Sequence, residues 1–153
     1  MKDIAAFLTE QTFFAGLEEA DLRLLAGCAV NEHVREGTLI FREGKRADRF
    51  YLIRKGRIAL EVLVPGRGRT VVDTLDAGEV VGWSWLVPPH RWSFDGRAVS
   101  EASLVAFDGA CLRGKCEADP RLGYLLMQRV SREMFDQLRA ARVRLADLYG
   151  RPR

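Results

Sequence analysis

The feature that most constrains the fold is a series of short apolar segments in the middle of the chain, separated by turns that contain glycine. The segments are rich in β-branched and aromatic residues, which is typical of strands. They lie around Val34 and at 38–41, 50–53, 58–63, 70–75 and 99–107. The turns lie at 35–37, 42–44, 54–56, 65–68 and 76–78. Short strands at this even spacing predict a double-stranded β-helix, the jelly-roll barrel.

Helical segments flank these strands. Residues 3–9 and 17–26 are expected to form two helices, because leucines supply an apolar face and acids occupy the first turn of the second helix. After Asp119 and Pro120, an apolar stripe predicts one amphipathic helix of about 30 residues, roughly 45 Å long. The stripe consists of Leu122, Leu125, Leu126, Val130, Met134, Leu138, Ala141, Leu145 and Leu148. Such a helix either kinks back onto the barrel or pairs with a second subunit as a coiled coil.

The 153 residues show no linker, repeat or low-complexity tract, so we expect one domain spanning 1–153. We expect a mainly β fold, with N-terminal helices in 1–29, the barrel in 30–108 and C-terminal helices in 109–150. The first ten residues carry acids and no long apolar run, which argues against a signal peptide. No apolar segment is long enough to cross a bilayer, so no membrane association is expected and the cytoplasm is the expected location.

Cysteine content and charge narrow the chemistry. Cys28, Cys111 and Cys116 are odd in number, which is a poor basis for a disulfide framework, so we expect free thiols in a reducing compartment. No histidine lies near Cys111 or Cys116 in the sequence, and we assign no metal. The net charge is +3, and eight arginines lie between 121 and 153. A basic final helix could contact nucleic acid or an acidic partner, but a solvated outer face is the commoner case.

Two stretches carry the functional signal. Residues 44–58 hold a glycine, an acid, an aromatic, an aliphatic and a second glycine at a regular spacing, and residues 78–98 follow with Gly78, Gly82 and Arg97-Ala98. Together with the glycine turns, they resemble the ligand-sensing domain of the catabolite-activator/fumarate-nitrate-regulator (Crp/Fnr) superfamily, over nearly the whole chain. In this resemblance, residues 78–98 correspond to the cassette that binds a cyclic phosphate: a turn, a short helix and a returning strand.

The resemblance implies where a ligand would bind. In the family, a cyclic nucleotide lies inside the barrel, its phosphate meets amides at the start of the cassette helix, an arginine and a serine, and a glutamate binds the ribose. Here Gly82 takes the helix-starting position, Trp83 stands for the glutamate and Trp92 for the arginine. Ser93 matches the serine, and a shift of one residue would bring Arg91 to the arginine position. The implied ligand-binding residues are Val81, Gly82, Trp83, Ser84, Arg91, Trp92, Ser93 and Arg97.

Three functional hypotheses follow. The first is a regulatory sensor with altered ligand preference or none, since Trp83, Trp92 and their aromatic neighbours either line a pocket for a planar anion or fill it. The second is a ligand-free dimerisation or docking module that uses the long helix. The third is a cyclic nucleotide (cAMP) binder in which Arg91 replaces the usual arginine. No cofactor is assigned; a cyclic nucleotide or another planar anionic small molecule is the candidate ligand.

Catalysis and DNA binding are not expected. The two histidines, His33 and His90, stand in no catalytic motif, and neither has an evident nucleophile or second ligand. Family transcription factors continue into a winged helix-turn-helix, whereas this sequence stops at Arg153, so sequence-specific DNA binding by this chain alone is not expected. The expected partners are a small molecule, a second copy bound through the long helix, and a protein partner. On that helix, the positions that approach the base in the family fall near Gln137 and Leu138.

Overall fold

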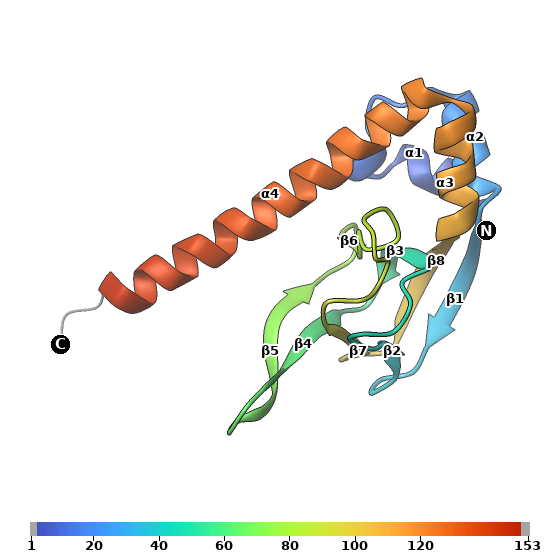
Figure 1. Ribbon diagram of the computed structural model, residues 1–153. Helices are drawn as coiled ribbons and strands as arrows, with labels where there is room; N and C mark the ends of the chain where they lie inside the picture. The colour runs from blue at the N-terminus through green and yellow to red at the C-terminus, as the bar shows by residue number, and fades with distance from the viewer. Residues whose placement is uncertain (1–2, 151–153) are drawn as a thin grey trace.

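Eight strands form two antiparallel sheets, each with four strands, in the computed structural model, which describes residues 3–150 (Figure 1). One sheet has the order β1-β8-β3-β6 and the other β2-β7-β4-β5. The strands are β1 (Ala29–Val34), β2 (Leu39–Phe41), β3 (Arg49–Lys55), β4 (Ile58–Val64), β5 (Gly68–Leu75), β6 (Val80–Val81), β7 (Asp95–Ala98) and β8 (Ala102–Asp108). The predicted jelly-roll barrel is confirmed, although β8 begins three residues later than expected; the family resemblance implied β7 as the returning strand of the cassette, and β6 was not predicted.

The helices lie at both ends of the chain, as predicted. They are α1 (Ile4–Thr9), the short 3-10 helix η1 (Thr12–Phe14), α2 (Glu19–Ala26), α3 (Gly109–Ala118) and α4 (Pro120–Gly150). Helix α4 is one unbroken element of 31 residues that extends well beyond the barrel, so it does not kink back (Figure 1). Because the helices hold more residues than the strands, the expected "mainly β" class understates the helix content. Among residues 3–150, no helix is sufficiently long and apolar to span a bilayer.

Strand β3 is buried on both faces over residues 50–53. Side chains alternate between the two faces of a strand, and β3 follows this rule. Phe50 and Leu52 pack among the helices in one core cluster, while Tyr51 and Ile53 pack between the two sheets in a second cluster. We call these the helix-side core and the barrel core. The barrel core contains the place where the family's ligand would lie.

The predicted glycine turns have a steric cause. Gly37, Gly44, Gly56 and Gly78 all have positive φ, a region that other residues rarely adopt. At Gly56 a second constraint applies, because a Cβ atom there would lie 2.5 Å from the Glu101 carbonyl oxygen. Glycine therefore permits the tight β3–β4 turn to pass directly against the start of β8.

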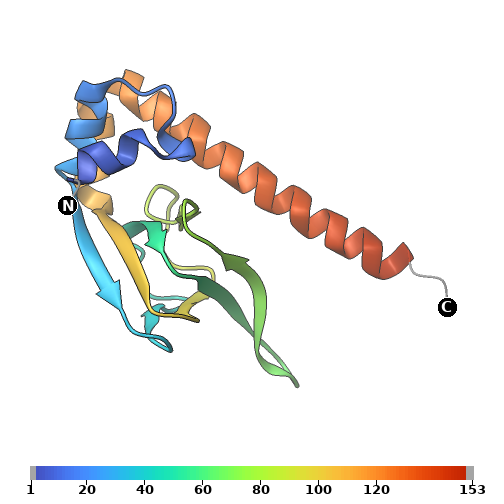
Figure 2. The ribbon, with the colours of Figure 1, turned by 180° about the vertical axis from the view of Figure 1, so that it is seen from behind.

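The N-terminal part of helix α4 packs on the helix-side core, and farther along the helix Arg144 Nη1 donates a hydrogen bond to the Val72 carbonyl in β5 at 2.8 Å. Leu122, Leu126 and Val130, spaced by four residues, are buried in the helix-side core. Next to them, Arg121 pairs with the buried carboxylate of Asp21, with 2.7 Å between Nη2 and Oδ1. From Leu138 to Gly150 every residue is exposed, and the helix leaves the body of the molecule (Figure 2).

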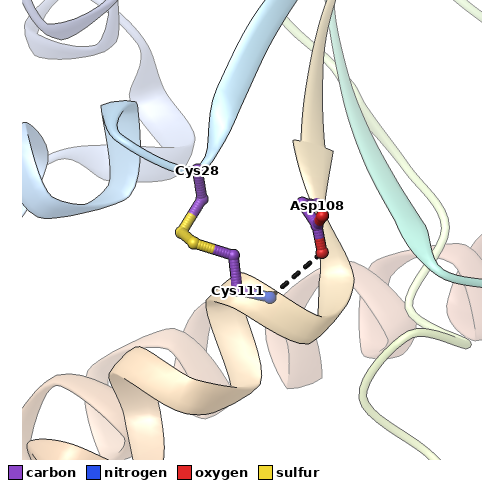
Figure 3. Close-up of a disulfide and its surroundings, with 3 residues drawn as sticks. All are labelled: Cys28, Asp108 and Cys111. Atoms are coloured by element: carbon purple, nitrogen blue, oxygen red, sulfur yellow. Dashed lines mark hydrogen bonds between the residues drawn. A yellow bond between two sulfur atoms is a disulfide. The ribbon is translucent and has the colours of Figure 1, made fainter.

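A disulfide joins Cys28 to Cys111, so the expectation that all three thiols are free is wrong (Figure 3). The two cysteines meet because β1 pairs with β8, with Ala29 opposite Phe107, and each cysteine lies just outside the paired segment. Asp108 caps α3 by accepting a hydrogen bond from the Cys111 amide at 3.0 Å, which holds Cys111 beside Cys28. Cys116 is the free cysteine among the described residues. The cysteine count therefore gives no support for a reducing compartment.

Loss of this disulfide is expected to lower the free energy of unfolding by roughly 2–4 kcal/mol, since the crosslink shortens a long loop in the unfolded chain. The test is urea unfolding of the wild type with and without reductant, compared with the Cys28→Ser/Cys111→Ser double variant. Reduced wild type and the double variant should unfold at the same urea concentration, below the oxidised protein. Cys116→Ser should keep the full response to reductant. Identical midpoints for oxidised and reduced wild type would contradict the prediction.

Candidate functional site

The Trp92 indole lies in the barrel core, against the cassette glycine. Its side chain is 5% exposed, and its ring stacks on Phe41 with 3.8 Å between centroids and 14° between planes. A Cβ atom at Gly82 would lie 2.4 Å from Cζ3 of Trp92. The indole thus occupies the space directly in front of the Gly82 backbone, where the family resemblance places the cyclic phosphate.

A second glycine completes this packing. A Cβ atom at Gly96, in β7, would lie 2.3 Å from Cζ of Phe41. The order through the barrel core is therefore the Gly82 backbone, the Trp92 ring, the Phe41 ring and the Gly96 backbone. Tyr51 extends the arrangement, with its ring nearly parallel to that of Phe41 at 6.1 Å. We call Trp92, Phe41 and Tyr51 the aromatic stack.

The segment between Gly82 and His90 contains turns and no helix, so the expected cassette helix is wrong. Two isolated hydrogen bonds close its turns, from the Leu86 amide to the Trp83 carbonyl at 3.0 Å and from the His90 amide to the Val87 carbonyl at 3.0 Å. Pro88 and Pro89 remove two amide donors, which prevents helical hydrogen bonding from continuing through this segment. A helix N-terminus that could attract an anion is therefore missing from this part of the described structure.

The other tryptophans occupy different environments. Trp85 is fully buried in the helix-side core, with its ring 5.7 Å from that of Phe50. Trp83 is partly buried against the same core and meets Phe94 edge to face at 6.3 Å. Ser84, between them, is buried. The aromatic residues of the cassette are thus divided between the two cores and do not form one wall.

The arginines of the predicted site make contacts elsewhere. Arg91 is exposed, and its Nη1 donates to the Gly44 carbonyl at 2.9 Å. Arg97 donates from Nε to Glu61 Oε1 at 3.1 Å and from Nη1 to the Gly37 carbonyl at 3.0 Å. Ser93 is exposed. The structure therefore brings Val81, Gly82 and Trp92 together in the barrel core, whereas Arg91, Ser93 and Arg97 make no recorded contact with Gly82.

Sequence reasoning missed two residues that shape this region. Phe41 provides the ring on which Trp92 stacks, and Asp95 is a buried acid at the start of β7. Asp95 accepts a hydrogen bond from the Glu43 amide at 2.7 Å and pairs with Arg69 through its other oxygen. It thereby ties the β2–β3 loop and the β4–β5 hairpin to the cassette strand. The sequence signal that could have identified Asp95 was its position next to Gly96 within the cassette.

No group of potential metal ligands is found among residues 3–150. In that range, no three histidine, cysteine or acidic side chains are grouped so that they could hold a metal ion. His33 lies on the surface, with Nε2 2.5 Å from Glu101 Oε1. His90 has a positive φ of 56°, and its carbonyl accepts a hydrogen bond from the Ala47 amide at 2.7 Å. Both histidines have roles in the local structure.

Two carboxylates approach each other where the cassette meets α4. Burial raises the pKa of Glu79, which lies just before β6; a hydrogen bond to the Asp76 backbone partly offsets this, and the charges of Asp76 and Asp73 add to the rise. Burial also raises the pKa of Glu133 on α4, and the nearby charges of Asp136 and Glu79 add to this effect. In the folded protein, burial therefore disfavours the ionised form of each carboxylate.

Comparison with known proteins agrees with this architecture. The cyclic nucleotide-binding domain matches the chain over residues 31–119. The chain belongs to the cyclic nucleotide-binding domain family. It is 26% identical over 138 residues to the HTH-type transcriptional regulator Cmr of Mycobacterium tuberculosis, which covers 90% of this chain and 54% of the regulator. The chain thus spans about half the length of this curated relative.

Two solved structures of such domains extend the likeness. A protein of Geobacter metallireducens GS-15, described as cyclic nucleotide-binding, has a TM-score of 0.80 at 26% identity, covering 90% of this chain and 99% of that one. The catabolite activator protein of Thermus thermophilus has a TM-score of 0.72 at 22% identity, covering 90% of this chain and 62% of that one. The second likeness shows the fold alone. The cyclic nucleotide-binding domain described here therefore keeps the family's architecture.

Glu133→Gln is expected to stabilise the protein at pH 7 and to have less effect near pH 4. A raised pKa means that the folded state binds the proton more tightly, so this stabilisation is present below the unfolded pKa and is lost as pH rises through the folded pKa. The wild type therefore carries an unfavourable charge at neutral pH that the variant lacks. Thermal unfolding at both pH values measures the difference. Asp147→Asn, on an exposed turn of the same helix, is the control, and an equal effect of both variants would refute this account.

Proposed function

We propose that the protein is a regulatory sensor of the cyclic nucleotide-binding family that has lost the usual cyclic-phosphate site and responds to a different ligand or to none. One observation carries the proposal: the Trp92 indole lies between the Gly82 backbone and the Phe41 ring. A cyclic phosphate at the Gly82 amide would have to displace this ring. The chain offers no acid at position 83 and no guanidinium at position 92 to compensate.

The energetic cost of that displacement is considerable. A tryptophan side chain buries roughly 150–250 Å². At about 25 cal/mol per Å², its exposure would cost on the order of 4–6 kcal/mol. Loss of the Phe41 contact adds about 0.5–1.5 kcal/mol. Missing one partner of a buried charged hydrogen bond typically costs a further 2–5 kcal/mol of binding, roughly. These penalties act in the same direction, so ordinary cAMP binding should be weaker by several orders of magnitude.

The alternative in which Arg91 holds the phosphate has no support from its contacts. Its guanidinium is exposed and bonds to the Gly44 carbonyl in the β2–β3 loop. On the long helix, Leu138 is 50% exposed and offers no hydrogen bond to a base. The histidines likewise favour a regulatory function over a catalytic one, since each is used in local structure. A cytoplasmic location stays a prediction.

A second role, dimerisation or docking through α4, is favoured by an exposed apolar seam. Its residues alternate at spacings of three, four or seven, the pattern of a coiled coil. The seam consists of Met127, Met134, Leu138, Ala141, Leu145 and Leu148. Leu145 and Leu148 are 53% and 66% exposed, and nothing in the described chain covers them. We propose that a second copy pairs with this seam, which would couple the sensor domains of two subunits.

The sensor proposal predicts no binding of cAMP to the wild type at about 1 mM, a free energy of only about −4 kcal/mol. The Trp83→Glu/Trp92→Arg double variant restores the two family side chains and should bind at least tenfold more tightly, measured by calorimetry. Trp83→Glu/Trp92→Phe is the matched control, because it opens space without adding the guanidinium, and it should stay inactive. Micromolar binding of cAMP by the wild type would refute the proposal.

The dimer proposal predicts that Leu138→Lys converts a dimer to a monomer in sedimentation velocity, because it places a charge in the apolar seam. Val143→Lys introduces the same charge on the opposite face of α4, where the side chain is also exposed, and should leave the dimer intact. A monomeric wild type, or equal dissociation by both variants, would contradict the proposal.

A further inference from the structure

A basic groove opens on the barrel between β2 and the start of β3, beside the aromatic stack. Its volume is about 330 Å³, at the lower end of the range of small-molecule sites, roughly 300–1,000 Å³. It is lined by Ile40, Phe41, Arg42, Lys45, Arg46, Asp48, Arg49, Tyr51 and Trp92. We call it the β2–β3 groove. Of the cassette residues that the family resemblance singles out, Trp92 alone contributes to its lining.

The cations of this groove are largely without acidic partners. No ion pair or hydrogen bond joins the side chains of Arg42, Lys45 or Arg46 to another residue within 3–150. Arg49 pairs with Glu32 at 3.0 Å, and Asp48 is the single acid in the lining. Like charges held close together repel one another and create a positive potential that attracts anions. The β2–β3 groove therefore presents three uncompensated cations to a ligand.

The loop that carries these cations is held in place by the cassette strand. The Gly44 amide donates to the Trp92 carbonyl at 2.8 Å, and the Trp92 amide donates to the Lys45 carbonyl at 2.9 Å. The Ala47 amide donates to the His90 carbonyl at 2.7 Å, and Ala47 itself is fully buried. Because the loop is fixed before any ligand arrives, less conformational entropy is lost on binding.

The floor of the groove adds a polar group and ring edges. Tyr51 is 6% exposed, and its hydroxyl has no hydrogen-bond partner among the described residues. Burial, with a smaller effect of the Glu32 charge, raises the pKa of Tyr51 to about 12, so the hydroxyl stays neutral and able to donate. The Tyr51 ring lies beside the stacked pair, 6.1 Å from the Phe41 ring and 6.3 Å from the Trp92 ring, and all three rings line the groove. Ring edges carry partial positive charge and favour anionic oxygens.

From this geometry we infer that the β2–β3 groove is a second ligand site, which takes a small molecule with several phosphate groups, such as a nucleoside triphosphate. Three unpaired cations match a ligand with three or more negative charges, and guanidinium groups bind phosphate oxygens in pairs. A single inorganic phosphate would leave most of the groove empty. The site is separate from the cyclic-phosphate position, since it does not require Trp92 to move.

The position of the site links it to the cassette. Its loop shares two backbone hydrogen bonds with Trp92, and the Trp92 ring packs against Gly82. A ligand bound to Arg42 and Arg46 would therefore be connected to the cassette through a single residue, Trp92. Trp92 also gives the site its own spectroscopic probe, because a bound anion changes the environment of the indole.

The test is calorimetric and fluorescence titration of the full chain with ATP at low salt. Saturable one-site binding with a change in tryptophan emission is expected. Arg42→Gln/Arg46→Gln should weaken it at least tenfold. The control, Arg35→Gln/Arg67→Gln, removes the same charge from exposed arginines outside the groove and should leave it unchanged.

Three results would overturn the inference. The first is no binding of ATP to the wild type. The second is equal weakening by both double variants, which would indicate general charge attraction only. The third is equally tight binding of inorganic phosphate or a short DNA duplex. None of these results depends on whether cAMP enters the barrel, so the test is independent of the proposed loss of the cyclic-phosphate site.

Discussion

The packing of the Trp92 indole between Gly82 and Phe41 is the interaction on which the rest of the site depends. It works only because glycine stands on both sides of the two rings, at positions 82 and 96, where any Cβ atom would collide with an aromatic carbon. We propose that this packing takes the space that the family uses for a phosphate. On this proposal the barrel keeps its shape and lacks the charge that would attract a cyclic nucleotide.

Trp92 bears on the proposed ligand site and leaves the fold unaffected. The two sheets, the β3–β4 turn at Gly56 and the buried start of α4 depend on packing that Trp92 does not disturb, so the family architecture survives intact. Positive charge is available on the outer side of the barrel. Arg91 bonds to Gly44, and Arg42, Lys45 and Arg46 surround the β2–β3 groove. The outer side of Trp92 therefore offers more positive charge to an anion than the interior of the barrel does.

The sequence predicted the fold well because periodicity and glycine turns are local signals. Residues 50–53 and 58–63 were recognised as strands, and Leu122, Leu126 and Val130 as one face of a long helix. The disulfide was missed because a cysteine count cannot show that β1 and β8 pair and bring Cys28 beside Cys111. The prediction of a cassette helix was wrong because it rested on the family resemblance and gave too little weight to Pro88 and Pro89, which lack amide donors. The hydrogen bond of Arg91 to Gly44 and the lining of the β2–β3 groove could not be predicted, because they join residues far apart in the chain.

The most direct test of the central claim is an NMR measurement of the distance between the Trp92 ring and Gly82 while cAMP is present in large excess. A nuclear Overhauser effect between the indole Hζ3 and the Gly82 Hα protons reports this contact without perturbing the protein. The account predicts that its intensity is the same with and without the nucleotide. Loss of the signal, together with a shift of the Gly82 amide typical of a new phosphate contact, would show that the ring moves aside and would contradict the account.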